Sequence, residues 1–417
     1  MKILVVVDSI NIEDSSGSKA NVALINNLVE AGFEVLVYHY TLKNIQLQGV
    51  NCFPIPEIKY NPLYVLSRIQ RIFNRKLNIN TAPFLELLFG FSFTFFNDTN
   101  SIVKVLNKLI FQPDLVLTLS KGGSFRPHYA LLKVPELHHI WMAYVHDPYP
   151  FHFYPRPYNW VESSYKAREA FFVQVSKKAK YSGFPSQLLM EWMGSYYPNF
   201  LETGVIIPHQ NGKYDFEISE QNSTFPFYFD IAKFNLLHAG NLMEHRSPKG
   251  LIEGFQLFLK TNPEVRNQVG LLLLGPSSNF AQMLDTYQKS IPELYVQDGI
   301  IAFEEVYHVQ KNVSVNIILE AKSEISPFLP AKFPHCVAAN KMILSLAPYY
   351  SETRRLLGNG YEYWSEVDDI QKIADIIGKL FYLWKKDPAN LLLNRSDLEG
   401  YISVDYLKQT IYDLYKN

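Results

Sequence analysis

Short runs of consecutive apolar residues, separated by stretches with helical periodicity, recur along this chain. The first run is ILVVV at residues 3–7, and VNIIL at 315–319 and MILSL at 342–346 each contain a single polar residue. A strand that is apolar at nearly every position is buried on both faces, which is typical of parallel sheets with helices on both sides. The chain is therefore predicted to be an α/β protein.

The pattern of strands and helices runs through the chain twice. Strands of the first half are predicted at residues 3–7, 34–40, 114–119, 139–145, 180–184 and 204–207. The second half has predicted strands in NLLHAG, VGLLLLGP, VNIIL and MILSL, and its helices include 251–259 and 370–384. Strands that alternate with helices predict a doubly wound, Rossmann-like sheet in each half.

A polar segment that contains proline separates the halves, and 417 residues exceed what one core supports. The predicted organisation is an N-terminal domain at 1–207, a linker at 208–233 and a C-terminal domain at 234–400. A last helix at 401–417 is predicted to pack back on the N-terminal domain. Two such domains are expected to face each other across a cleft formed by the carboxyl ends of their strands, where open α/β sheets bind ligands.

Charge and cysteine content exclude several classes of protein. The formal net charge is -1, so no overall field favours nucleic acid. The two cysteines, Cys52 and Cys336, form neither a disulfide framework nor a metal-ligand set. The N-terminus lacks an export signal, so a cytoplasmic protein is expected. The apolar segment 84–96 contains Glu86 and is too short to span a bilayer, and it is expected in a core or an interface.

Basic residues follow the first predicted strand of the second half. Arg246 and Lys249 precede a helix that starts near Pro248. Unpaired N–H groups and two cations at a helix start suit a pyrophosphate, although two solvated surface cations are an equally good interpretation. Gly240 and Gly275 end the first two strands, and glycine lets a flat ring approach the backbone or simply forms a turn.

A third loop has the unusual sequence SPFLPAKFPHCVAANK, from Ser326 to Lys341. Its prolines fix a rigid path out of the preceding strand. Lys332 is placed at the start of a predicted helix at 333–340, and His335 follows within one turn. His335 is either a contact to a ligand in this loop or a hydrogen-bonded core histidine.

In the first half, the strand that ends in YV is followed by His146 and Asp147. A histidine at the carboxyl end of a strand faces the predicted cleft and suits hydrogen bonding or proton transfer near neutral pH. The next loop is rich in aromatic rings, including Tyr149 and Tyr154. Such rings stack on sugars, but packing is the expected role of at least half of them.

The two-domain layout, HAGNLMEHRSPKG, His146 and SPFLPAKFPHCVAANKMIL together resemble retaining glycosyltransferases of family 4, which have the GT-B fold. The resemblance covers the whole chain in organisation and is specific at about 236–255 and 326–346. It implies a C-terminal domain that binds a nucleotide-sugar donor and an N-terminal domain that binds the acceptor.

The resemblance assigns roles residue by residue. Arg246 and Lys249 resemble the basic pair on the donor diphosphate, and His146 resembles the histidine near the donor sugar; these three are the predicted catalytic residues. Predicted donor contacts are Gly17, Gly240, Gly275, Ser326, Lys332 and His335. Predicted acceptor-side residues are Asp147, Tyr149 and Tyr154.

This chain differs from that family in one motif. The family carries two glutamates eight positions apart, whereas this chain has Pro327 and His335 in their places and Glu324 three residues early. A neutral histidine also bonds a ribose hydroxyl, and Lys332 compensates in part. No clustered Asp-x-Asp site is present, so the diphosphate is expected to be neutralised by cations and helix dipoles, with no metal and no cofactor.

The resulting prediction is a retaining, hexosyltransferase-like enzyme of cell-surface polysaccharide or glycoconjugate synthesis. It would move a sugar from a nucleoside diphosphate sugar to a glycan or lipid-linked acceptor. A non-catalytic nucleotide-sugar-binding protein or partner subunit is an alternative. A nicotinamide-dependent oxidoreductase is less favoured, because DSINIEDSSGSK lacks the glycine triplet of dinucleotide sites.

Residues 62–76, PLYVLSRIQRIFNRK, have helical periodicity, with Leu66, Ile69 and Phe73 on one side and arginines on another. Such a helix either rests on the inner face of an anionic membrane, which would make the protein a peripheral one, or packs on its own domain. Both alternatives stay open at the level of sequence.

Overall fold

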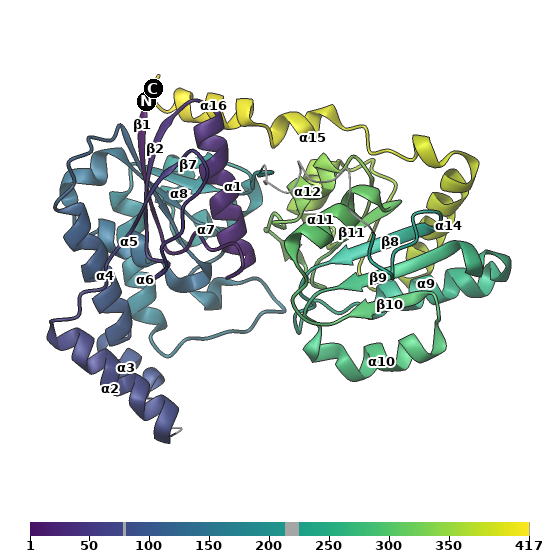
Figure 1. The fold of residues 1–417 in the computed structure, drawn as a ribbon, viewed down its shortest axis with the longest axis horizontal. Helices are drawn as coiled ribbons and strands as arrows, with labels where there is room; N and C mark the ends of the chain where they lie inside the picture. Colours follow the sequence, from purple (N-terminus) through teal and green to yellow (C-terminus); the bar gives the residue numbers. More distant parts are fainter. Residues whose placement is uncertain (78–80, 213–224, 417) are drawn as a thin grey trace. The chain divides into compact units, whose positions relative to one another are not determined.

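The structure is a computed structural model that describes residues 1–77, 81–212 and 225–416 (Figure 1). The chain divides into two compact units. Unit 1 comprises Met1–Tyr154, Tyr158–Gly212 and Ile402–Asn417, and unit 2 comprises Pro155–Pro157 and Lys213–Tyr401. The middle of the predicted linker, 213–224, lies outside the described residues.

Unit 1 contains a parallel sheet of seven described strands in the order β3-β2-β1-β4-β5-β6-β7. The strands are β1 (Lys2–Val7), β2 (Glu34–His39), β3 (Asn51–Pro54), β4 (Leu115–Leu119), β5 (Trp141–Tyr144), β6 (Tyr181–Phe184) and β7 (Gly204–Ile206). The first strand lies inside the sheet, and the chain builds outward from it in both directions, as in a doubly wound fold.

Alternate side chains of β1 enter two different cores, because successive residues of a strand point to opposite faces. Ile3, Val5 and Val7 pack with α1, whereas Leu4 and Val6 pack with α4, α6 and α7. The helices of unit 1 are α1 (Ser16–Glu30), α2 (Pro62–Leu77), α3 (Ala82–Phe89), α4 (Phe93–Leu106), α5 (Arg126–Leu131), α6 (Tyr165–Lys178), α7 (Gln187–Tyr196), α8 (Asn199–Thr203) and α16 (Val404–Asp413).

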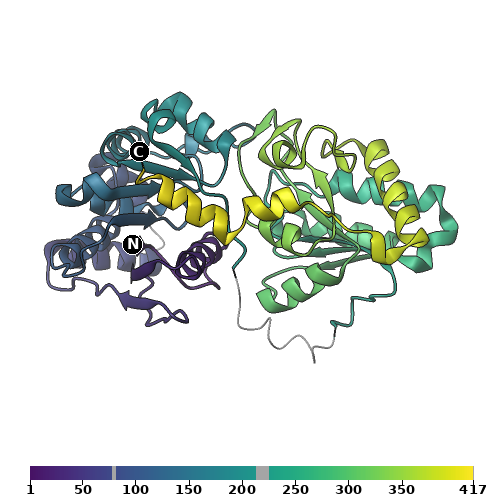
Figure 2. The same ribbon diagram turned by 90° about the horizontal axis from the view of Figure 1, so that it is seen from above.

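The C-terminal helix α16 belongs to unit 1 and lies beside α1 (Figure 2). Leu407 and Ile411 of α16 are buried in the same core as β1. The rings of Tyr412 and Phe33 are 5.4 Å apart, and the Tyr415 hydroxyl donates to the carbonyl of Asp114 at 2.5 Å. The end of the chain is therefore part of the packing of the N-terminal sheet.

Unit 2 contains a parallel sheet of six described strands in the order β10-β9-β8-β11-β13-β15. The strands are β8 (Phe234–Ala239), β9 (Val269–Leu274), β10 (Leu294–Gln297), β11 (Val315–Leu319), β13 (Met342–Leu346) and β15 (Trp364–Ser365). A separate short pair joins β12 (Ile325–Ser326) to β14 (Tyr350–Ser351).

Helices cover both faces of the sheet in unit 2. One core contains Phe255 of α9 and Ile377 of α14, and a smaller one contains Val309 of α11. The helices are α9 (Lys249–Thr261), α10 (Ala281–Ser290), α11 (Phe303–Asn312), α12 (Phe333–Ala338), α13 (Glu352–Leu357), α14 (Ile370–Lys386) and α15 (Ser396–Tyr401).

The fold agrees with the predicted class of two doubly wound α/β domains. The segment at 84–96 divides between two environments: Phe91 and Phe95 are buried in unit 1, whereas Phe84, Leu87, Leu88 and Phe89 are each more than half exposed. In the part of the chain that the structure describes, no helix is long and apolar enough to cross a membrane.

Candidate functional site

In unit 2 the strands β8 and β11 are neighbours. The chain continues from β8 to β9 toward one edge of the sheet and from β11 to β13 toward the other edge. Such a topological switch point leaves room beyond the carboxyl ends of the two strands, and open α/β sheets bind ligands there. The loop after β8 contains Gly240 and Arg246, and the loop after β11 contains Glu320 and Lys332. Three of the predicted residues, Gly240, Arg246 and Lys332, therefore lie on two loops at this point.

Three basic side chains, His238, Arg246 and Lys332, meet here and are called the basic cluster below. Lys332 Nζ lies 3.3 Å from His238 Nδ1. Arg246 donates from Nη1 to the carbonyl of Asn241 at 3.4 Å, and its buried Nε has no hydrogen-bond partner among the described residues. No carboxylate of the described chain lies within ion-pair distance of Lys332 or Arg246.

The positive charges of the basic cluster repel one another. Burial, together with the nearby Arg246 guanidinium, lowers the pKa of Lys332 from 10.5 to about 7, against the opposing effects of Cys336 and Glu320. Burial also holds the pKa of His238 well below its usual value, and Lys332 and Arg246 lower it further. An anion would relieve this repulsion and restore the full charge of Lys332.

A buried carboxyl group lies next to the basic cluster. Glu320 directly follows β11, and the hydroxyl of Ser326 donates to its Oε2. Burial raises the pKa of Glu320 to about 7, against the opposing effects of Ser326, Thr353 and Arg246. Glu352 is also buried, but Arg355 binds both of its oxygens, at 2.7 and 3.0 Å. The sequence analysis did not identify Glu320, although its place directly after a strand was the available clue.

Gly240 and Gly275 bring the ends of β8 and β9 into close contact. Their φ angles are +150° and +128°, which favour glycine. A Cβ atom at Gly275 would lie 2.7 Å from the carbonyl oxygen of Gly240, and one at Gly240 would lie 3.1 Å from Lys332 Nζ. Both glycines therefore make room for the backbone and for the lysine of the basic cluster.

Two further residues predicted to bind the donor, Lys249 and His335, have contacts with other parts of unit 2. The Lys249 side chain is 60% exposed, and its Nζ lies 3.8 Å from Glu253 Oε1 on the next turn of α9. His335 is buried on α12, where its ring packs 5.4 Å from Phe303 and 5.8 Å from Tyr307 of α11. Two aromatic rings of α11 thus pack against the histidine that replaces the second glutamate of the motif.

Unit 1 has a corresponding switch point between β1 and β4. Asp8 directly follows β1 and is buried, and it accepts hydrogen bonds from the Ser124 hydroxyl and from the backbone N–H of Lys121 at 3.2 Å. Arg126 lies 3.5 Å from Asp8 and 3.0 Å from Asp98 of α4. This ion-pair network joins the loops after β1 and β4, and the sequence analysis missed it because its members are far apart along the chain.

Gly17 stands in the first turn of α1 at the same switch point. A Cβ atom there would lie 3.8 Å from the backbone nitrogen of Gly122, which is ordinary contact distance. The start of α1 therefore adjoins the loop after β4.

His146, after β5, is fixed by Asn21 of α1. Asn21 Nδ2 donates to the carbonyl of Ser120 at 3.0 Å, so its Oδ1 accepts from His146 Nε2, at 2.8 Å. His146 Nδ1 is then unprotonated, and it has no partner among the described residues. Burial, with His209 and His128 nearby, holds the pKa of His146 well below its ordinary value. The ring is a neutral hydrogen-bond acceptor at Nδ1.

The predicted acceptor-side residues have different environments. Burial raises the pKa of Asp147 to about 6, and a hydrogen bond with Tyr154 opposes that rise. The ring of Tyr154 packs edge to face with those of Tyr158 and Trp160, with centroids 5.6 and 5.0 Å apart. Tyr149 is fully buried, and its hydroxyl accepts from Arg168 at 3.1 Å. The structure therefore places Tyr149 in the core of unit 1.

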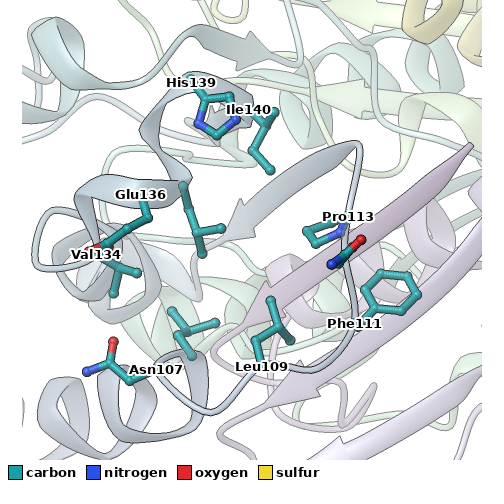
Figure 3. Close-up of a pocket in the computed structure, with 11 residues that line it drawn as sticks. Asn107, Leu109, Phe111, Pro113, Val134, Glu136, His139 and Ile140 are labelled. Atoms are coloured by element: carbon teal, nitrogen blue, oxygen red, sulfur yellow. The ribbon is translucent and has the colours of Figure 1, made fainter.

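A surface pocket of about 590 Å³ lies elsewhere in unit 1 (Figure 3). Residues 106–113, which precede β4, and residues 134–140, which precede β5, line it. The pocket is thus at the amino ends of these strands, at the opposite edge of the sheet from His146 and Asp8. Over the described ranges, no group of three His, Cys, Asp or Glu side chains is arranged to hold a metal ion.

No protein-family model and no curated protein matches this sequence. Solved structures do match its fold. A glycosyltransferase from Rickettsia africae ESF-5 aligns with a TM-score of 0.61 at 13% identity, covering 100% of this chain and 97% of the other. HepE of Anabaena, solved with UDP and glucose, aligns with a TM-score of 0.58 at 12% identity, covering 100% and 99%.

The α,α-trehalose-phosphate synthase (UDP-forming) from Burkholderia xenovorans, in complex with glucose-6-phosphate, aligns with a TM-score of 0.62 at 10% identity over 100% of both chains. At these identities the likeness shows the fold, which is that of GT-B glycosyltransferases. The fold predicted from the sequence is confirmed, while membership of family 4 rests on the motif alone.

Proposed function

We propose that the protein is a glycosyltransferase that moves a sugar from a nucleoside diphosphate sugar to a glycan or lipid-linked acceptor, with retention. The observation that carries the proposal is the basic cluster of unit 2, where Lys332 and Arg246 lie at a switch point with no carboxylate of the described chain within ion-pair distance. The solved structures with the same fold, which include a UDP-glucose complex, support a nucleotide-sugar as the donor.

The chemistry assigned to the basic cluster is stabilisation of the leaving group. When the bond between the sugar C1 and the diphosphate oxygen breaks, negative charge accumulates on the diphosphate. Cations positioned before the reaction lower the energy of that transition state more than that of the ground state. Arg246 and Lys332 would supply most of this effect, with Lys249 contributing from the start of α9.

The other roles follow the resemblance. Gly17, Gly240, Gly275, Ser326 and His335 remain proposed donor contacts. His146 would accept a hydrogen bond from a sugar hydroxyl through Nδ1, and Asp147, Tyr149 and Tyr154 remain proposed for the acceptor side. Because Tyr149 is fully buried, it would act through the packing of its loop. We assign no metal and no protein nucleophile to the reaction.

The proposal is tested by donor turnover. The full-length protein is incubated with a panel of nucleoside diphosphate sugars, with and without an acceptor fraction of lipid-linked glycans, and released nucleoside diphosphate is measured. We expect release from at least one donor and faster release with the acceptor. Absence of release from every donor, in a preparation that binds the nucleoside diphosphate, would favour a different function.

That different function is a nucleotide-sugar-binding protein or partner subunit without transfer activity. The environment of His335 favours it as the second candidate, because a histidine packed against Phe303 and Tyr307 replaces a motif glutamate. Saturable donor binding without turnover would support this alternative.

A further inference from the structure

Helix α2 of unit 1 exposes its apolar face and buries part of its polar face. Ser67 is 1% exposed, whereas Ile69 is 44% and Ile72 is 52% exposed. A surface helix of a globular protein ordinarily does the reverse and turns its apolar stripe toward the core. The apolar stripe of α2 comprises Val65, Leu66, Ile69, Ile72 and Phe73.

The following helix, α3, is exposed in the same way. Phe84 is 64%, Leu87 65%, Leu88 60% and Phe89 53% exposed. Figure 1 shows α2 and α3 beyond α4, at the end of unit 1 away from its sheet. We call the exposed apolar residues of both helices the α2–α3 surface. Large exposed apolar surfaces of this kind mark contacts with proteins or membranes.

Polar contacts hold these helices in place, with the apolar residues outward. Asn61, next to α2, donates to Asn97 of α4 at 2.9 Å. Glu86 of α3 accepts from the buried Arg168 of α6 at 2.9 Å, and Arg168 also binds the Tyr149 hydroxyl. The side of each helix that faces unit 1 is therefore engaged through polar groups.

The charge around the α2–α3 surface is positive. Helix α2 contains Arg68, Arg71, Arg75 and Lys76 and no acidic residue, and Arg68 is paired with Glu57 at 3.3 Å. The single acidic residue of α3, Glu86, is paired with Arg168. Self-association through α2 would bring the remaining cations of one copy against those of another, which is unfavourable. An anionic lipid surface complements both the apolar residues and the cations.

We propose that the α2–α3 surface inserts into the interfacial layer of an anionic membrane. The proposal deepens the function proposed above, because it places the acceptor-side unit at a lipid surface and favours a lipid-linked acceptor over a free glycan. It does not depend on the donor site, since none of the residues that carry it belongs to unit 2.

The test is flotation of the full-length protein with vesicles of phosphatidylcholine alone or of equal parts phosphatidylcholine and phosphatidylglycerol. We expect binding to the anionic vesicles that weakens with salt, and little binding to the neutral ones. The double variant Leu87→Gln, Leu88→Gln should lower the partition coefficient by about a hundredfold, because two large apolar side chains no longer insert.

A charge variant and a matched control test the electrostatic half of the proposal. Arg75→Gln with Lys76→Gln should lower partition onto anionic vesicles by about ten- to thirtyfold. Lys385→Gln with Lys386→Gln removes the same charge at the exposed end of α14 in unit 2 and should leave partition unchanged.

Two outcomes of the binding assays would overturn the proposal: equal binding to neutral and anionic vesicles, or equal losses of binding in the two charge variants. A third would be a wild-type dimer that becomes monomeric in the Leu87→Gln, Leu88→Gln variant while vesicle binding is unchanged. Nucleotide binding by each variant is measured in parallel. Loss of vesicle binding with intact nucleotide binding separates failure of this surface from failure of the donor site.

Discussion

Lys332 is the residue whose environment is hardest to explain without a ligand. It is placed beside His238 and near Arg246, and burial makes its charged form costly. A chain selected for stability alone would have an apolar side chain here, or a carboxylate within ion-pair distance of the lysine. The arrangement is explained if an anion completes it, since a diphosphate would lie against both cations.

We predict that the protein takes up protons when it binds a nucleoside diphosphate. The pKa of Lys332 is depressed to about 7 in the free protein, so above that pH the side chain is largely neutral. A bound diphosphate favours the charged form and raises the pKa, so affinity should be greatest below about pH 7 and should fall as the pH rises toward the usual lysine value.

Calorimetry at about pH 8 in buffers of different ionisation enthalpy measures this uptake. The nearby groups that also titrate are His238, whose pKa is far below this range, and Glu320, whose pKa is about 7. Uptake should be lost in Lys332→Met and kept in Glu320→Gln. The reverse pattern would assign the proton to Glu320.

Arg246 and Lys249 should differ when each is replaced by alanine. Arg246→Ala should lower kcat/KM by an amount that corresponds to about 2–3 kcal/mol of lost transition-state stabilisation, the typical effect of one positioned hydrogen-bond donor. Lys249 is exposed and close to Glu253, so Lys249→Ala should cost less, about 0–1 kcal/mol. Steady-state kinetics with one donor measure both. Equal effects would show that Lys249 reaches the diphosphate as fully as Arg246.

At the scale of elements, the carboxyl ends of β8 and β9 determine the shape of the candidate donor site. Gly240 donates its backbone N–H to Leu274 at 2.8 Å, and Leu242 donates to Pro276 at 2.8 Å. The loops after the two strands are therefore tied together, and Lys332 contacts the same segment. Strand packing and the position of the basic cluster are thus linked.

Gly275→Ala tests this link. The added methyl group would lie 2.7 Å from the Gly240 carbonyl, at a φ of +128°, so we expect a loss of about 2–4 kcal/mol in the free energy of unfolding and weaker nucleotide binding. Gly360→Ala is the control, because no atom lies within 4 Å of its Cβ position. Thermal denaturation and nucleotide titration compare the two variants. If the Gly275→Ala protein is as stable as the Gly360→Ala control, the ends of β8 and β9 do not require glycine for close packing.

Across the whole molecule, the sequence predicted the strands that are apolar at nearly every position. Runs such as 315–319 and 342–346 became buried strands at the expected places. The described strands that sequence reasoning missed are two to four residues long and carry exposed or half-buried positions, so no apolar pattern distinguishes them from loops; they are β3, β10, β12, β14 and β15.

The candidate site was predictable only in part, for a physical reason. Position after a strand predicts which loops meet, so Arg246 and Lys332 could be found from the sequence. The side-chain packing within those loops depends on distant elements. Glu320 is buried by contacts that include Ser326 and Thr353, and His335 packs on α11, neither of which a local pattern shows.

The central claim is that the basic cluster of unit 2 binds the diphosphate of a nucleotide-sugar. The direct measurement is the dissociation constant of the full-length protein for a panel of nucleoside diphosphates and the matching monophosphates, by calorimetry. We predict that at least one diphosphate binds about ten- to a hundredfold more tightly than its monophosphate, since the second phosphate gains charge-assisted hydrogen bonds. This preference should disappear in Lys332→Met. Equal affinity for both forms, or an unchanged preference in Lys332→Met, would contradict the claim.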